Sequence, residues 1–278
     1  MQGIEREMKK ILRSFNQLFD SVIELRKNAA SEKEKVTGMS GQKSDFLQVL
    51  LDLHNESEDS ATSFTMKHIK GILMDTLVGG TDTTSTMTEW VMAELMQHPE
   101  KMEKMKKELC DVVGLNNTVE EFHLPSLSYL NAVIKESFRM HPPLPLIFPR
   151  CCGQSLVLGG YTIPKGSRVF LNMWSINMDP NVWDNPSEFQ SERFLNDTDK
   201  FDFRYLPFGA GRRMCPGLSL EEKMLALILA SLLHSFDWKL PQGTELELSS
   251  KFGLVVKKKI PLRLISVPRL TNSELYKE

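Results

Sequence analysis

The residues best suited to chemistry lie between Phe208 and Gly217, which read Phe-Gly-Ala-Gly-Arg-Arg-Met-Cys-Pro-Gly. Glycines allow a backbone to bend tightly around a bulky ligand. Cys215 comes shortly before an apolar run that starts at Leu218 and predicts a helix. The unpaired N–H groups and the positive dipole of a helix N-terminus favour the thiolate form of a nearby cysteine. A thiolate surrounded by backbone N–H groups is one way in which proteins hold haem iron.

A more ordinary interpretation is available for Cys215. A lone cysteine is usually a buried apolar side chain, and a glycine-rich turn accommodates it without any ligand. That interpretation explains the glycines but not the joint spacing of the other residue types. The spacing favours a ligand loop built from five positions: Phe208, Gly211, Arg213, Cys215 and Gly217.

A second polar group interrupts a long apolar pattern. Residues 64–97 contain no proline and repeat their apolar side chains at helical spacing, yet they include the run Gly79-Gly80-Thr81-Asp82-Thr83-Thr84. Two glycines inside a helix cost about 1 kcal/mol each relative to alanine. A threonine can bond back to the carbonyl four residues earlier and bend the helix, which predicts a local groove for a small ligand and water. A plain kink, or a helix that begins at Asp82, is the alternative.

The remaining pattern predicts a mainly α-helical fold with small β-sheets. Further helices are expected over residues 1–28, 46–53 with Asp45 as the cap, 98–113, 127–140, 174–178 and 218–233. A hairpin is expected over 159–166, a strand over 168–171 and short strands after Phe236. Residues 29–44, 54–63 and 179–206 are expected to form loops. The first helix is basic and amphipathic; such helices can lie on membranes, but we favour packing of its apolar stripe within the domain.

The composition argues against several classes of protein. The 278 residues include 34 Lys and Arg and 36 Asp and Glu, so the net charge of −2 gives no support for nucleic-acid binding. The four cysteines contain no Cys-x-x-Cys pair and suit neither a zinc site nor a disulfide framework, and reduced thiols are expected. No stretch approaches the ~20 apolar residues needed for a transmembrane helix, and the charged N-terminus does not resemble a signal peptide.

The cysteine segment resembles the ligand loop of the cytochrome P-450 monooxygenases, a family of haem-thiolate enzymes. The resemblance implies that Cys215 is the axial ligand of the iron of haem b (iron protoporphyrin IX). It also implies that Arg213 and Arg150 reach the haem propionates, with Phe208, Gly211 and Gly217 completing the loop.

The glycine-threonine run resembles the distal-helix motif of the same family. The resemblance implies that Asp82 and Thr83 form an acid-alcohol pair that supplies protons during oxygen activation. It implies that Gly79 and Gly80 let the helix approach the haem face.

Two structural features of the family also have counterparts in this sequence. Glu136 and Arg139 lie three positions apart on one predicted helix, and the resemblance implies that Arg193 joins them in a structural triad behind the haem. By the same resemblance, residues 144–147 and 252–254 line the substrate pocket.

The resemblance extends along the whole chain but implies only the C-terminal portion of the family's fold. It predicts a single partial cytochrome P-450 domain over residues 1–278, with the long distal helix, the Glu-x-x-Arg helix, the meander and the cysteine loop. The N-terminal membrane anchor and the early helices of the family have no counterpart in this sequence.

The resemblance further implies a monooxygenase that inserts one oxygen atom from O2 into a small lipophilic substrate. Similarity to plant enzymes of the geraniol 8-hydroxylase group suggests a terpenoid, with electrons from NADPH through NADPH–cytochrome P-450 reductase at the cytosolic face of the endoplasmic reticulum membrane. One alternative is a reductase-independent isomerase or dehydratase, although such relatives tend to lack the acid-alcohol pair. A truncated, catalytically silent family member is the other.

Overall fold

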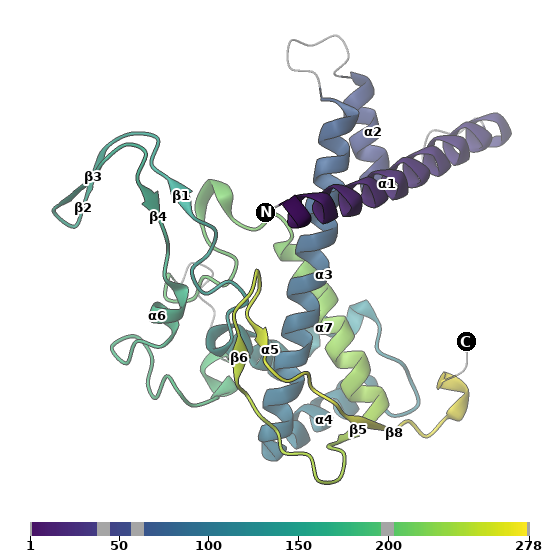
Figure 1. Cartoon of the computed structure of the whole chain (residues 1–278). Helices are drawn as coiled ribbons and strands as arrows, with labels where there is room; N and C mark the ends of the chain where they lie inside the picture. The colour runs from purple at the N-terminus through teal and green to yellow at the C-terminus, as the bar shows by residue number, and fades with distance from the viewer. Residues whose placement is uncertain (1, 38–44, 57–63, 196–202, 277–278) are drawn as a thin grey trace. The chain divides into compact units, whose positions relative to one another are not determined.

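The computed structural model describes residues 2–37, 45–56, 64–195 and 203–276, without side-chain detail at residue 2 and residues 30–37. Figure 1 shows the helices and strands along the chain. The chain divides into two compact units, Met1–Gly79 and Gly80–Glu278. The boundary falls within the third helix, α3 (Met66–Gln97), between the two glycines noted in the sequence.

The first unit contains α1 (Gln2–Thr37), α2 (Phe46–Glu56) and the beginning of α3. Its small core consists of Ile23, Leu50, Leu51 and Ile69. The Asp45 carboxylate accepts a hydrogen bond from the Gln48 N–H at 2.9 Å, which confirms the predicted cap of α2.

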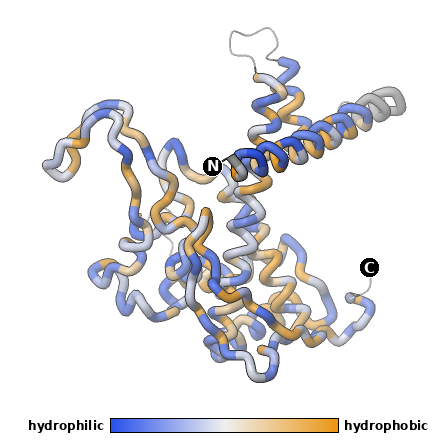
Figure 2. The backbone as a smooth tube through the Cα atoms, viewed as in Figure 1, coloured by the Kyte–Doolittle hydropathy of each residue, from blue (hydrophilic) through white to orange (hydrophobic). Residues whose placement is uncertain are grey.

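The long first helix differs from its prediction in two respects. It continues to Thr37, so the loop predicted over 29–44 is wrong for residues 29–37, and residues 38–44 lie outside the described part. Its apolar stripe, visible in Figure 2, is buried only at Phe19 and Ile23, and most of the remaining stripe is exposed: Ile4, Met8, Ile11, Leu12, Leu18, Val22 and Leu25. The exposure follows from length: α2 has 11 residues and is about 17 Å long at ~1.5 Å per residue, so it can cover only part of the 36-residue α1.

The second unit has a helical core. The C-terminal part of α3 packs with α4 (Pro99–Val113), α5 (Ser128–Met140) and α7 (Leu218–Ser235). Each helix contributes side chains that are almost fully buried, among them Trp90, Leu109, Leu130 and Leu229. Figure 2 shows hydrophobic residues along α7. Apolar burial of this kind is the main favourable term in folding, and it fixes the helices that carry the candidate residues.

The ends of these helices follow recognisable rules. Pro99 occupies the first turn of α4, and Gly114 follows the last residue with φ 79°, as the sequence predicted. The N-terminus of α5 is capped from another helix, because the two carboxylate oxygens of Glu108 accept from the Tyr129 N–H at 2.6 Å and the Leu130 N–H at 3.0 Å.

The described residues also form four two-stranded antiparallel sheets. β1 (Arg150–Cys151) pairs with β4 (Arg168–Val169), and β2 (Leu156–Leu158) pairs with β3 (Tyr161–Ile163) through a turn at Gly159 and Gly160. β5 (Phe236–Lys239) pairs with β8 (Ile265–Pro268), and β6 (Ser250–Lys251) pairs with β7 (Lys257–Lys258). The predicted hairpin forms, but it spans residues 156–163 rather than 159–166, and the strand expected over 168–171 is shorter.

The other segments are short. They comprise α6 (Met173–Asn177) and the 3₁₀ helices η1 (Glu121–Ser126), η2 (Ser191–Phe194), η3 (Gly211–Arg213) and η4 (Ser273–Tyr276). Helix α2 includes residues 54–56, which were expected to form a loop, and residues 57–63 and 196–202 lie outside the described part. The fold is therefore mainly α-helical with small sheets, as predicted. No helix in the described ranges combines the length and apolarity needed to cross a bilayer.

Candidate functional site

Cys215 lies in an exposed loop that leads into α7. The loop turns at Gly209 and Gly211, whose φ angles of 72° and 76° fall in the left-handed region that favours glycine. The Cys215 N–H donates to the Phe208 carbonyl at 3.0 Å and closes the loop. The thiol is free and exposed, so the buried-cysteine interpretation is wrong.

The other loop residues hold this arrangement in place. The ring of Phe208 packs against Phe138 of α5 with 5.3 Å between ring centroids, which anchors the loop to the helical core. A Cβ atom at Gly217 would lie 3.8 Å from the Cys215 sulfur, so glycine keeps this side of the thiol open. The loop thus presents one soft sulfur ligand with little side-chain cover.

Two arginines meet beside the cysteine loop. The Arg150 guanidinium, at the start of β1, donates from Nη2 to the Arg213 carbonyl at 3.1 Å. Within the described ranges neither guanidinium forms an ion pair. A guanidinium group is well suited to carboxylates, which it can bind in bidentate fashion.

The segment before β1 contains a strained residue. Ile147 has φ 48°, an outlier for a β-branched side chain. Its Cδ1 atom lies 3.7 Å from the position that a Cβ atom on Gly209 would occupy. Strain of this kind persists only where the surrounding structure holds the residue in place, and here the segment expected to line a pocket packs against the cysteine loop.

The second candidate group lies on α3, which continues through Gly79 and Gly80. A helix that begins at Asp82 is therefore excluded. The predicted back-bonding occurs nearby, because the Thr86 hydroxyl donates to the Asp82 carbonyl at 2.7 Å and the Thr88 hydroxyl to the Thr84 carbonyl at 2.9 Å. Among the described residues, no atom outside the helix backbone lies within 4 Å of a Cβ added at Gly79 or Gly80.

The acidic residue of this group has a partner that the sequence did not indicate. The Asp82 carboxylate, with a side chain 33% exposed, forms an ion pair with the Lys257 ammonium of β7. Thr83 beside it is half-buried. The next hydroxyl, on Thr84, is buried and has no hydrogen-bond partner within the described part of the chain.

The expected triad forms at the far end of α5. Glu136 and Arg139 are both fully buried, and the Arg193 Nε lies 3.2 Å from Glu136 Oε1. Arg139 also donates from Nη1 to the carbonyls of Asn177 and Pro186, each at 2.8 Å. A buried ion pair needs such additional partners, so this cluster ties α5 to the segment around η2.

Sequence analysis missed Glu221, in the first turn of α7. Its side chain is 8% exposed, and neither carboxylate oxygen has a partner among the described residues. Burial, with a smaller contribution from the neighbouring Glu222, raises the pKa of Glu221 to about 7. The sequence did contain an indication that Glu221 is buried. Glu221 begins the buried stripe of α7 that continues at four-residue spacing with Leu225, Leu229 and Leu233.

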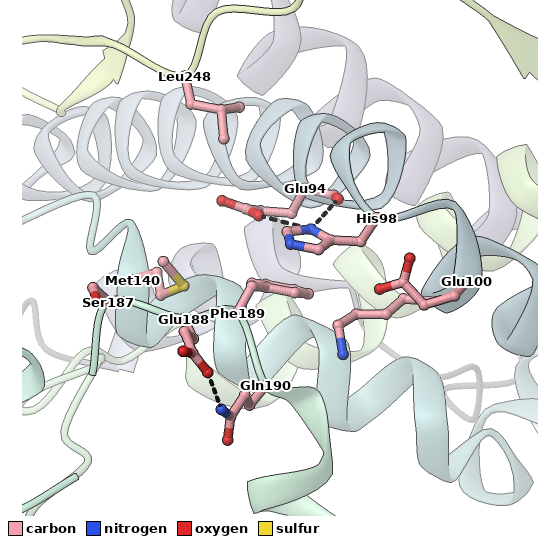
Figure 3. A pocket seen from close by; sticks show the side chains of 10 residues that line it. Glu94, His98, Glu100, Met140, Ser187, Glu188, Phe189, Gln190 and Leu248 are labelled. Atoms are coloured by element: carbon pink, nitrogen blue, oxygen red, sulfur yellow. Dashed lines mark hydrogen bonds and ion pairs between the residues drawn. The ribbon is translucent and has the colours of Figure 1, made fainter. Parts of the chain in front are cut away.

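Two cavities lie elsewhere in the second unit. Figure 3 shows an open cavity of about 470 Å³ in which the His98 ring meets Glu94, and Gln190 donates to Glu188. Another, of about 650 Å³, lies between η1 and α7. Neither is lined by a residue that the sequence analysis assigned to the site. Dashed lines in Figure 3 join two polar pairs, His98 with Glu94 and Gln190 with Glu188, and neither pair belongs to the Cys215 loop.

Comparison with known proteins identifies the class. The cytochrome P450 family model matches residues 1–265. Carnosic acid synthase of Salvia pomifera is 42% identical over 275 residues, which cover 96% of this chain and 53% of the relative. Geraniol 8-hydroxylase of Swertia mussotii is 41% identical over 277 residues, which cover 96% of this chain and 53% of that relative. A zebrafish cytochrome P450 structure with abiraterone superimposes with a TM-score of 0.77 at 34% identity, covering 83% of this chain and 56% of that one.

The chain therefore belongs to the cytochrome P450 family. It spans about half the length of the curated relatives that it matches. Membership implies haem iron as the prosthetic group.

The residues around Cys215 fit that prosthetic group. An exposed thiol supplies the sulfur ligand, and the adjoining backbone turns through glycines rather than bulky side chains. Arg213 belongs to the cysteine loop and the Arg150 guanidinium contacts its backbone, so both arginines belong to the site of a ligand with two carboxylates.

Proposed function

We propose that this chain forms the haem-thiolate part of a monooxygenase that inserts one oxygen atom from O2 into a small lipophilic substrate. The observation that carries the proposal is the exposed Cys215 thiol, closed into a glycine-turned loop by its bond to Phe208. Haem b, when bound, supplies the oxygen chemistry, and a thiolate ligand favours O–O cleavage.

The chain's own residues would hold the haem as follows. Cys215 would ligate the haem iron, and Arg213 and Arg150 would bind the propionates. Phe208, Gly211 and Gly217 would shape the loop that carries Cys215. Gly79 and Gly80 leave room along α3, since a Cβ added at either position would meet no atom within 4 Å outside the helix backbone in the described part of the chain.

Proton supply falls to Asp82 and Thr83. A threonine hydroxyl is too weak an acid to act alone, so the part we give Thr83 is to orient water. The Asp82 carboxylate, partly exposed on the same helix turn, would connect this water to solvent.

Substrate, partners and location follow from the relatives. The relative named geraniol 8-hydroxylase supports hydroxylation of a terpenoid-like molecule. We propose that NADPH–cytochrome P-450 reductase delivers the electrons from NADPH at the cytosolic face of the endoplasmic reticulum membrane. Residues 1–278 act as a single partial cytochrome P-450 domain within that assembly.

The decisive experiment is spectroscopic. The full chain is loaded with haemin, reduced and exposed to carbon monoxide, and the thiolate-ligated absorption band is measured. The band is expected in the wild type and should vanish in Cys215→Ala. Cys151→Ala is the matched control, because Cys151 is also free and exposed, and it should retain the band.

Three results would contradict the proposal. Absence of the band from a wild-type chain with a native circular dichroism spectrum would indicate a catalytically silent family member. Retention of the band in Cys215→Ala would assign the ligand to another residue. Turnover of a peroxide without reductase would indicate an isomerase or dehydratase.

A further inference from the structure

We infer that Lys257 is a positioning residue for the Asp82 carboxylate, so that strand β7 contributes to the proton supply proposed for α3. The inference rests on the proposed function, because it concerns the acid of the acid-alcohol pair. Lys257 and Asp82 are separated by 175 residues in the sequence, and the fold brings their side chains into an ion pair.

The geometry suits orientation better than stabilisation. The two side chains are 47% and 33% exposed, and ion pairs at such positions contribute little to stability because water screens them. An ammonium group, however, offers three donors on a flexible stem and can hold a carboxylate in one rotamer. The backbone of Asp82 is also held in place, since its carbonyl accepts a hydrogen bond from the Thr86 hydroxyl at 2.7 Å.

A purely structural role for Lys257 would be to dock its segment on α3. Other contacts already do this. The Trp90 indole donates to the Val256 carbonyl at 3.3 Å, and the Glu89 carboxylate accepts from the Leu262 N–H at 2.7 Å. The Val256 N–H in turn donates to the Pro143 carbonyl at 2.9 Å. The segment therefore stays beside α3 without Lys257, which leaves the amine free to act on Asp82.

The neighbouring lysines separate this role from a general effect of charge. Lys258 is buried, and its ammonium lies 5.3 Å from the Trp90 ring centroid. Lys259 is exposed and forms no ion pair within the described ranges. Lys259→Met is consequently a matched control for Lys257→Met, because both remove one exposed positive charge from the same segment, at positions two residues apart.

The first measurement needs no haem. In protein labelled with ¹³C at aspartate carboxyls, the Asp82 resonance is identified as the one lost in Asp82→Asn. It is expected to shift in Lys257→Met and to keep its wild-type position in Lys257→Arg and Lys259→Met. Lys257→Arg and Lys259→Met both keep a cation at position 257, so a shift confined to Lys257→Met assigns the effect to that cation, while an unfolded variant would shift all of the aspartate resonances.

The second measurement uses the haem-loaded chain with reductase. The ratio of product formed to NADPH oxidised is expected to fall several-fold in Lys257→Met, with the thiolate band and KM unchanged. Lys257→Arg should restore most of the ratio, and Lys259→Met should leave it at the wild-type value. Suppose that Lys257→Met shows a normal thiolate band. An unchanged Asp82 resonance or an unchanged ratio in this variant would then overturn the inference about Lys257 and leave the proposed function standing. Loss of the band from the wild type would instead overturn the proposed function.

Discussion

Arg139 donates to both carboxylate oxygens of Glu136 at 2.8 Å, from two donors of one guanidinium, and both side chains are fully excluded from water. Desolvation of two charges is expensive, and only further hydrogen bonds make such a pair tolerable. The Gln190 N–H supplies one of these, at 2.8 Å from Glu136 Oε1. The pair therefore joins α5 to the chain before η2 through an interaction that fails if either partner is removed.

Glu136→Gln is expected to destabilise the protein by about 3–5 kcal/mol, because it leaves the Arg139 charge buried without a counter-ion. Urea unfolding followed by circular dichroism measures the change. Glu121→Gln is the control: its pair with Lys223 is exposed, and its unfolding midpoint should stay at the wild-type value. Equal midpoints for Glu136→Gln and the wild type would contradict the structural role of the triad.

The backbone of the cysteine loop leads to a second prediction. Gly211 has φ 76°, and among the residues that the structure describes an added Cβ would meet no atom within 4 Å, so the obstacle to a side chain is conformational. Gly211→Ala should cost about 1–2 kcal/mol and reduce haem retention. Gly211→Asn should cause a smaller loss of stability and of haem retention, because asparagine tolerates the left-handed region.

Gly153→Ala tests the reasoning behind the Gly211 series. Gly153 also has open space for a Cβ but does not adopt a positive φ, so its substitution should leave haem retention at the wild-type level. Retention is measured as the ratio of haem to protein absorbance after gel filtration. If Gly211→Ala and Gly153→Ala behaved alike, loop strain would not control haem binding.

The buried carboxyl of Glu221 predicts a dependence of stability on pH. Burial raises its pKa from the ordinary 4.5 to about 7, so the folded state binds a proton that the unfolded state releases. The free energy of unfolding should therefore fall as pH rises from about 4.5 to 7 and then level off. At pH above this range Glu221→Gln should be more stable than the wild type by about 3 kcal/mol.

Urea unfolding at a series of pH values tests this expectation. The free energies of unfolding of the wild type and Glu221→Gln should be similar near the acid end of the range and should differ increasingly toward neutral pH. Glu222→Gln, an exposed neighbour on the same helix, should follow the wild type closely. Parallel profiles for the wild type and Glu221→Gln would show that this carboxyl does not change its pKa on folding.

The hydroxyl of Thr83 gives a prediction about coupling. Thr83→Ala should retain the thiolate band, because Thr83 does not ligate the iron in the proposed site, but it should release peroxide at the expense of product. Thr83→Ser keeps the hydroxyl and should recover most of the product yield. Peroxide and product are measured per NADPH oxidised. A product yield in Thr83→Ala equal to that of the wild type would remove Thr83 from the proton path.

Local pattern predicted much of the fold. Helical spacing gave α3, α4, α5 and α7 to within a few residues, because an amphipathic helix records its buried face in residues close along the chain. The Gly114 stop and the Gly159–Gly160 turn were equally readable, since each depends on a backbone conformation that favours glycine. The spacing around Cys215 was enough to suggest a sulfur ligand.

Other features depended on the path of the whole chain. The Glu108 cap of α5 and the Lys257 partner of Asp82 join residues separated by 21 and 175 positions, and no periodicity encodes such pairs. The exposed stripe of α1 was also unpredictable, because burial depends on how much of a helix its neighbours cover. The sequence alone therefore determined the helices and the ligand loop through short-range spacing. The tertiary structure decided which distant charges meet and which carboxyl, Glu221, is enclosed without a partner.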